Sequence, residues 1–333
     1  NSCFFYYVAI NQCIQNKCGT MEQKSLLQTL SSIIQELKEN GQWGTAHVYQ
    51  SAYNSFALFS CCRDIPFKKF TPALLKDFEI YLRKRKCSWN TVSTYMKVLR
   101  ATYNRAVDEG YASYVPRLFR HVQTGGSSER KRSLEASDMG GLMNGKGEEL
   151  SAGMERTLAI LQLMFILRGI PFVDLAYLRK SDIQGNILRY RRRKTGRRLT
   201  VILTPEALKL IDTLSDKREE SPYLLPFLTS PEGSEEAYRE YQRALRSFNR
   251  QLAALGERFG GSTPISTYTI RHTWATMAYY CEIHPGIISE AMGHSSIAVT
   301  ETYLKPFRDD RIDEANREVI SYVKKQARKN SGR

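Results

Sequence analysis

The most informative segments of this sequence are TIRHTWAT (residues 269–276) and GHSSIAVTETY (residues 293–303). They bring an arginine at position 271, a histidine at 294 and a tyrosine at 303 into a short stretch near the C-terminus. A tyrosine phenol is a modest nucleophile, but it attacks phosphorus when arginine and histidine donors collect the charge on the phosphate oxygens. These residue types therefore predict breakage and rejoining of DNA strands.

The overall charge agrees with a nucleic-acid partner. The 333 residues include 49 Lys and Arg against 34 Asp and Glu, a formal net charge of +15. Such an excess favours a polyanion over a small acidic molecule. An anionic membrane surface would also attract it, but no apolar run reaches the roughly 18 residues needed to span a bilayer. We expect a cytoplasmic, nucleoid-associated protein with no membrane partner.

The cysteines and the N-terminal residues bear on the compartment and on the start of translation. The seven cysteines are an odd number and form no CxxC pair, which favours reduced cytosolic thiols over a disulfide framework. Residues 1–20 differ in composition from the rest, so we interpret them as an N-terminal extension and Met21 as a candidate true start.

Residues 21–122 are predicted to form a helical DNA-binding domain, since the length of the chain allows two domains. Ser88 or Asn90 can cap a helix with one apolar stripe at three-and-four spacing: Val92, Tyr95, Met96, Leu99, Tyr103 and Ala106. Lys97 and Arg100 fall off that stripe and are candidate DNA-binding residues. The basic run at 83–86 is either a further DNA contact or a solvated helix end.

Residues 123–133 have the composition of a flexible, basic linker. Glycines and serines at 125–128 are followed by Arg130, Lys131 and Arg132. A segment with these properties can follow a DNA backbone, so these three residues are predicted to bind DNA.

Residues 134–307 are predicted to be mainly helical with one β-hairpin. Ile187–Lys194 and Leu199–Leu203 have strand character and are joined by a short turn containing Gly196. Seven of the ten residues from 189 to 198 are basic, and none is acidic. We expect the hairpin to contact phosphates through Arg191, Arg193 and Arg197, the alternative being an exposed positive hairpin without a ligand. The fold class is therefore mainly α with a small β-hairpin or sheet.

The motifs at residues 271–276, 293–296 and 300–303 resemble the tyrosine recombinase (phage integrase) family, and the resemblance covers most of the chain. It implies a helical N-terminal DNA-binding bundle, a basic linker and a mixed α/β catalytic domain. It also implies that Tyr303 attacks the scissile phosphate, forming a 3′-phosphotyrosyl link and freeing a 5′-hydroxyl. Because the link keeps the energy of the broken bond, no cofactor is expected. Nor does any acidic cluster or cysteine–histidine spacing predict a metal site.

The resemblance assigns further roles within the catalytic set. Arg271 is expected to clamp the phosphate and His294 to donate a hydrogen bond to it. Lys194, at the turn of the hairpin, matches the family's lysine that protonates the departing 5′-oxygen. Lysine suits that role better than the neighbouring arginines, which are almost always charged.

Two positions depart from the family pattern. The first catalytic arginine falls on Pro171; Arg168, three residues earlier, shares a predicted helix face with Leu161 and Met164 and can supply a guanidinium instead. The alternative is that Arg168 forms a structural pair with Asp174. Tyr268 stands where the family more often has histidine, and its phenol, with an ordinary pKa near 10, is a poor general base at neutral pH.

Residues 308–333 are predicted to form a tail helix with a basic end. By resemblance, the tail packs on a neighbouring subunit in a homotetramer on paired recombination sites in double-stranded DNA; packing on its own domain is the alternative. We favour a site-specific recombinase for integration, excision or inversion of DNA. A type IB-like topoisomerase and a catalytically impaired DNA-binding protein are the alternatives, but binding alone does not need this lysine, arginine, histidine and tyrosine.

Overall fold

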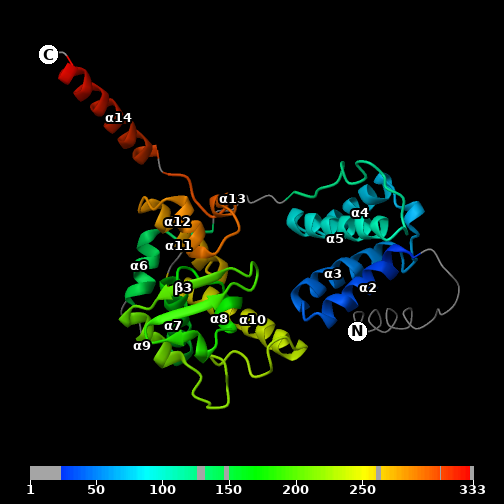
Figure 1. Ribbon diagram of the computed structural model, residues 1–333, viewed down its shortest axis with the longest axis horizontal. Helices are drawn as coiled ribbons and strands as arrows, with labels where there is room; N and C mark the ends of the chain where they lie inside the picture. Colours follow the sequence, from blue (N-terminus) through cyan, green and yellow to red (C-terminus); the bar gives the residue numbers. More distant parts are fainter. Residues whose placement is uncertain (1–23, 126–131, 146–149, 260–263, 308, 331–333) are drawn as a thin grey trace. The chain divides into compact units, whose positions relative to one another are not determined.

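The computed structural model describes residues 24–125, 132–145, 150–259, 264–307 and 309–330. The chain forms two compact units, Asn1–Ser128 together with Gly233–Tyr238, and Glu129–Glu232 together with Arg239–Arg333. Both units are mainly helical, and a small sheet lies in the second (Figure 1). The predicted fold class, mainly α with a small sheet, is confirmed.

The first unit is a helical bundle built around aromatic side chains. Its helices are α2 (Leu26–Glu39), α3 (Trp43–Phe59), the 3-10 turn η1 (Phe67–Lys69), α4 (Pro72–Lys84) and α5 (Trp89–Asp108). Phe56 of α3 and Phe78 of α4 pack edge to face with ring centroids 5.0 Å apart. Burial of such rings together with their aliphatic neighbours contributes to the hydrophobic driving force for the fold.

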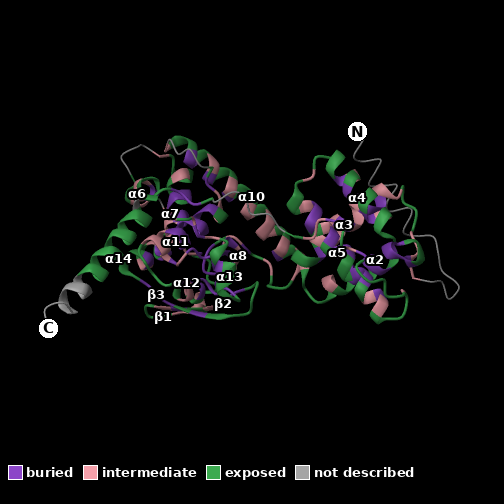
Figure 2. Ribbon diagram, turned by 90° about the horizontal axis from the view of Figure 1, so that it is seen from above, coloured by how far each residue is buried: buried purple, intermediate pink, exposed green. Residues whose placement is uncertain are grey.

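Helix α5 begins and packs as its sequence predicts. The Ser88 hydroxyl accepts a hydrogen bond from the amide of Thr91 at 3.2 Å, so Ser88 is the N-cap. Five of the six predicted stripe residues are buried and the sixth, Tyr95, is half-buried, whereas Lys97 and Arg100 are exposed. Figure 2 shows buried residues on the inward sides of the helices in both units.

The second unit packs its helices against one face of a three-stranded sheet. The helices are α6 (Ala136–Asn144), α7 (Ala152–Ile166), α8 (Phe172–Ala176), α9 (Pro205–Leu214), α10 (Glu235–Arg258, whose first residues cluster with the first unit), α11 (Thr267–Tyr280), α12 (Pro285–Met292), α13 (Ile297–Glu301) and α14 (Asp309–Asn330), with the 3-10 turn η2 (Lys180–Asp182). Leu161 and Leu163 of α7 and Ile270 of α11 belong to one buried core.

The sheet contains the predicted hairpin and one short extra strand. The antiparallel order is β1 (Ile183–Gln184), β2 (Ile187–Arg191) and β3 (Arg198–Ile202). Leu188 of β2 lies opposite Val201 of β3, and both are buried. Because side chains alternate across a strand, every second residue of β2 faces the core.

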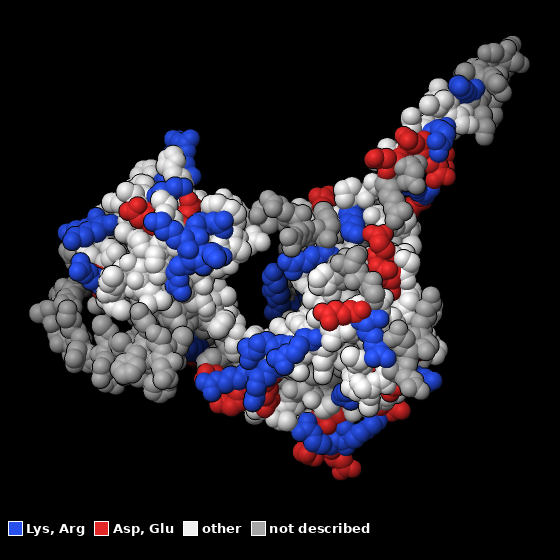
Figure 3. Space-filling view, turned by 180° about the vertical axis from the view of Figure 1, so that it is seen from behind, with Lys and Arg blue, Asp and Glu red and all other residues white. Residues whose placement is uncertain are grey.

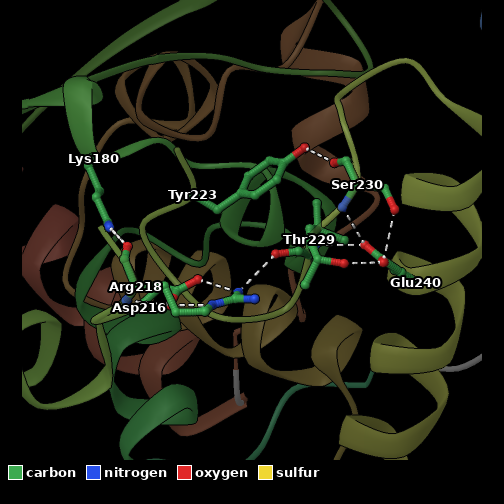
Figure 4. Close-up of polar contacts among 8 residues, drawn as sticks. Lys180, Asp216, Arg218, Tyr223, Thr229, Ser230 and Glu240 are labelled. Atoms are coloured by element: carbon green, nitrogen blue, oxygen red, sulfur yellow. Dashed lines mark hydrogen bonds and ion pairs between the residues drawn. The ribbon is translucent and has the colours of Figure 1, made fainter. Parts of the chain in front are cut away.

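A polar network holds the loop between α9 and α10. The carboxylate of Glu240 accepts hydrogen bonds from the amides of Thr229 and Ser230 at 2.7 and 3.1 Å (Figure 4). In the same loop Arg218 donates to the buried Asp216 carboxylate at 2.5 Å, and this bond lowers the pKa of Asp216 below its ordinary value. These contacts are structural, and they involve none of the predicted catalytic residues.

Helix α14 is not covered by its own domain. Every side chain described in it is exposed, including Ile312, Val319, Ile320 and Val323. The apolar residues of the tail are therefore not buried on its own domain, which Arg311 of α14 contacts through an ion pair with Glu282. No helix in the described part of the chain combines the length and the hydropathy needed to cross a bilayer.

Candidate active site

Helix α11 presents Arg271 at the centre of a buried cluster. The Ser266 hydroxyl accepts a hydrogen bond from the amide of Thr269 and caps the helix. The Arg271 guanidinium donates to the carbonyl oxygens of Gly169 at 2.7 Å and Met292 at 2.8 Å, and to Nε2 of His294 at 2.9 Å. Arg271 is only 3% exposed, and burial is the main reason that its pKa is lowered.

Gly169 allows the turn after α7 to approach α11 closely. Its φ is +64°, and a Cβ there would lie 3.1 Å from the Cα of Arg271. Any larger residue at this position would push the carbonyl oxygen of residue 169 away from the Arg271 guanidinium. Gly169 therefore helps to place Arg271.

His294 is buried directly after α12 and is held at both ring nitrogens. Since a guanidinium only donates, Nε2 is the acceptor of the Arg271 bond, and the ring proton is on Nδ1. Nδ1 then donates to the Thr300 hydroxyl at 2.8 Å. Burial, followed by the charges of Arg271 and Arg192, lowers the pKa of His294 to about 3. The imidazole is therefore neutral at physiological pH.

Tyr303 follows α13 and packs against this cluster. Its ring stacks on His272 with centroids 4.3 Å apart and lies 4.9 Å from the ring of His294. The Thr276 hydroxyl donates to its carbonyl oxygen at 3.2 Å, which fixes the backbone. The Arg271 guanidinium lies 5.8 Å from the centroid of the Tyr303 ring. The structure thus brings together Arg271, His294 and Tyr303.

Tyr268 also reaches Tyr303. Its hydroxyl donates to the hydroxyl oxygen of Tyr303 at 3.2 Å, and the Arg132 guanidinium lies 5.9 Å from its ring centroid. Burial, followed by this hydrogen bond, raises the pKa of Tyr268 to about 12. Tyr268 is therefore a hydrogen-bond donor to the phenol oxygen in this structure.

The β2–β3 turn docks on the loop that carries His294. Thr195 donates to the carbonyl oxygen of Gly293 at 3.2 Å, and Arg197 donates to that of His294 at 2.7 Å. Lys194, one residue before Thr195, is exposed at this end of the hairpin, and its charge contributes to the lowered pKa of His294. The hairpin therefore adds Lys194 to the same cluster.

Arg168 does not lie on the predicted helix face. Helix α7 ends at Ile166, and Arg168 adopts a φ of +62° in the turn that follows. Its guanidinium donates to the carbonyl oxygen of Thr200 on β3 at 3.3 Å. The suggested pair with Asp174 is also wrong, because Asp174 binds Arg192 at 2.5 Å and accepts from the amide of Arg193 at 3.0 Å.

Arg192 is the site residue that sequence reasoning missed. It is 5% exposed and lies directly after strand β2, where it continues the inward series of Leu188 and Tyr190. That alternation was a usable signal, but the surrounding basic residues concealed it.

The remaining predicted DNA-binding residues have different surroundings. Arg100 of α5 lines a hollow of about 410 Å³ together with Arg117 and Arg120. Arg193 stacks on Tyr177 at 3.8 Å and forms an ion pair with Glu232. The other exposed residues of this group are Lys97 and Arg191, and Arg130 and Lys131 lie outside the described residues. Figure 3 shows Lys and Arg side chains gathered in patches on each unit.

Sequence comparison identifies the family. Residues 133–309 match the phage integrase family, and residues 25–120 match the phage integrase SAM-like domain. The chain belongs to the phage integrase family. Together the two matches span most of the chain, which is therefore a tyrosine recombinase. No curated protein sequence gives a significant match to it.

Solved structures of integrases share the fold of this recombinase. The Tn1549 transposon integrase in complex with a circular intermediate DNA is 14% identical with a TM-score of 0.60, covering 88% of this chain and 99% of that chain. A lambda integrase dimer bound to a COC′ core site is also 14% identical, with a TM-score of 0.59, covering 84% and 95%. A lambda integrase tetramer bound to a Holliday junction is 17% identical, with a TM-score of 0.58, covering 86% and 80%.

Proposed function

We propose that this site-specific recombinase cuts and rejoins double-stranded DNA through a covalent link between Tyr303 and a 3′-phosphate. The observation that carries the proposal is the packing of the Tyr303 phenol against the Arg271–His294 pair, with the Tyr268 hydroxyl bonded to its oxygen. In the first step the Tyr303 phenol releases its proton to solvent, its oxygen bonds to phosphorus, and the bond between phosphorus and the 5′-oxygen breaks. The departing oxygen takes a proton from Lys194 and becomes a 5′-hydroxyl. Attack by a 5′-hydroxyl on the phosphotyrosyl link reverses these changes and reseals the strand.

The other residues of the cluster stabilise the charge that develops on the phosphate. Arg271 presents a buried guanidinium whose fork can hold two phosphate oxygens. His294 can donate a hydrogen bond to a phosphate oxygen only when its Nε2 carries a proton. In this structure Nε2 accepts from Arg271, so the imidazole must change its tautomer before it binds the phosphate. Tyr268 donates to the phenol oxygen and so helps to position the nucleophile.

Basic residues outside the cluster are proposed to hold the DNA backbone. Lys97, Arg100 and Arg191 are exposed. Arg132 is also exposed, and its guanidinium lies beside the ring of Tyr268. Arg193 and Arg197 contact other residues of the protein. We therefore propose that they hold the hairpin in place as well as binding DNA. The Tn1549 and lambda integrase structures contain DNA, and we extend that partner to this chain.

We further propose that four copies assemble on paired sites and exchange their C-terminal helices. The apolar side chains at 312, 319, 320 and 323 of α14 are exposed, and a hydrophobic stripe of this kind suits a partner surface. A chain truncated before Asp309 should form the covalent adduct on a single site but lose the assembly on paired sites. Full assembly by the truncated chain would contradict the exchange.

The test of the chemistry uses supercoiled DNA carrying candidate inverted repeats from the locus of this protein's gene, with EDTA present. A covalent adduct and a rearranged product are expected, and Tyr303→Phe should abolish both. Tyr280→Phe is the matched control, because it removes a hydroxyl bonded to the carbonyl of Pro306 and leaves the nucleophile intact. Strict dependence on a divalent ion would contradict the proposed metal-independent route. Relaxation without rearrangement would favour a topoisomerase, and binding without an adduct would favour a DNA-binding protein.

A further inference from the structure

The recombinase has no arginine where its family places the first one, because Pro171 occupies that position. Pro171 is the N-cap of α8 and has no side-chain donor to offer a phosphate. A phosphodiester carrying extra charge in the transition state still needs donors on its oxygens. A guanidinium from elsewhere in the fold must therefore compensate, or the enzyme must work without it.

Arg192 lies where such a group is needed. It continues the inward face of β2 after Leu188 and Tyr190, and its side chain is almost fully buried. Gly293 packs directly on its stem, since a Cβ at Gly293 would lie 2.8 Å from the Cγ of Arg192. Gly293 immediately precedes His294, so the Arg192 side chain lies beside the histidine that binds Arg271.

The guanidinium of Arg192 is only partly satisfied by the protein. Its Nη1 donates to the Asp174 carboxylate of α8 at 2.5 Å, and both side chains are buried. Its Nε is also buried and has no hydrogen-bond partner among the described residues. A buried donor without a partner is unfavourable, and a charged one more so. A phosphate oxygen arriving at the cluster would satisfy it.

The electrostatics of the cluster agree with an anionic ligand. The charge of Arg192 lowers the pKa of both Arg271 and His294, so the groups act on one another across a short separation. Asp174 balances only one of the two buried guanidinium groups. The excess positive charge is unfavourable in a site of low solvent access and is relieved by a phosphodiester.

We propose that Arg192 binds a non-bridging oxygen of the scissile phosphate and replaces the arginine missing at Pro171, with Asp174 as the positioning residue that aims it. The inference rests on the proposed function. Arg168, the residue favoured from sequence, is directed to the carbonyl of Thr200 on β3 and is half-buried. Its guanidinium has an acceptor already, and no described contact joins it to His294 or Tyr303.

The experiment measures the rate of covalent adduct formation by the full-length chain on the DNA described above. Arg192→Ala should lower the rate by about a hundredfold or more, the usual effect of removing one donor to a transition-state oxygen. Arg192→Lys keeps a cation beside Asp174 but loses the fork, and should also be slow. Arg218→Ala is the matched control, because it leaves the buried Asp216 unpaired in the loop before α10 and should not change the rate.

Two further measurements separate a catalytic role from a structural one. The first adds Pro171→Arg to Arg192→Ala, which returns a guanidinium to the family position and should recover the rate by roughly tenfold or more. The second uses a methylphosphonate at the scissile position, which removes one negative charge. If Arg192 binds that phosphate, Arg192→Ala should lose much less on the neutral substrate than on the natural one. If Arg192→Ala does not fold, because it leaves the buried Asp174 carboxylate unpaired, the double variant Arg192→Ala/Asp174→Asn removes that charge and takes its place in the assay.

The outcomes are distinct. Equal penalties on the charged and neutral substrates, or a larger loss with Arg168→Ala than with Arg192→Ala, would overturn the role of Arg192 while leaving the recombinase intact. A wild-type chain that binds the DNA but forms no adduct would overturn the proposed function and this inference together.

Discussion

Removing the hydroxyl of Tyr268 should slow DNA cleavage only modestly. In Tyr268→Phe the ring remains beside His272, but the hydrogen bond to the Tyr303 oxygen is lost. That bond is 3.2 Å long and half-exposed, so its net worth is about 0.5–1.5 kcal/mol. Since 1.36 kcal/mol corresponds to tenfold in rate, the rate of adduct formation should fall about two- to tenfold.

The small effect distinguishes a hydrogen-bond donor from a general base. A pKa of about 12 leaves only about one Tyr268 in 10⁵ ionised at pH 7, too few to serve as a proton acceptor. Loss of a true general base would cost about 10²- to 10⁴-fold. The assay is single-turnover adduct formation at saturating protein, with thermal unfolding measured in parallel to verify the fold.

Tyr268→His is the informative companion variant. It restores the residue more common in the family, whose ordinary pKa near 6.5 suits proton transfer at neutral pH. Cleavage by this variant should show a new decline as the pH falls below about 6.5, where the imidazole becomes protonated and ceases to accept. A loss of more than a hundredfold in a folded Tyr268→Phe would refute the donor role.

Three further perturbations test the rest of the cluster. Lys194→Ala should slow cleavage about 10²- to 10⁴-fold, and a 5′-bridging sulfur should restore the rate because a thiolate leaves without a proton; Lys194→Arg should remain slow on the ordinary substrate. Thr300→Val leaves the Nδ1 donor of buried His294 without its acceptor, so urea unfolding should show about 1–3 kcal/mol less stability. The pKa of His294, about 3 in the folded chain, lies below its ordinary 6.5, so the unfolded chain binds the extra proton between these values. The contribution of His294 to the free energy of unfolding should be complete above about pH 6.5 and fall towards pH 3 by at most about 1.4 kcal/mol per pH unit. His294→Gln should remove this part of the pH dependence of stability. An unchanged pH dependence would contradict the buried neutral state.

Much of the fold followed from local patterns. The apolar spacing from Val92 to Ala106 specified α5 because one continuous stripe can be buried only by a helix, and Ser88 had the side chain to begin it. The two strands of the hairpin followed from β-forming residues around a glycine turn. These features depend on residues near one another in the chain, so sequence reasoning reaches them.

The first arginine could not be assigned from sequence because the answer depends on where α7 ends. Nothing in the composition of that helix stops it before Arg168; it ends because the Arg168–Gly169 pair takes positive φ values to let Gly169 meet Arg271. That contact joins residues about a hundred positions apart and is invisible to helical periodicity. Arg192 was hidden for a related reason: its ion pair with Asp174 of α8 joins two segments that meet only in the folded structure.

The same long-range contacts bear on how the site meets DNA. Arg271 donates to two backbone carbonyls and to His294, so its placement is set before any phosphate arrives. The bond to His294 differs from the other two, because it uses the nitrogen that must donate if the histidine is to bind a phosphate oxygen. Phosphate entry should therefore exchange this one bond while the carbonyl bonds remain. The mutual repulsion of Arg271 and Arg192 is relieved in the same step, so DNA carrying the scissile phosphate should raise the unfolding temperature more for the wild type than for Arg192→Ala.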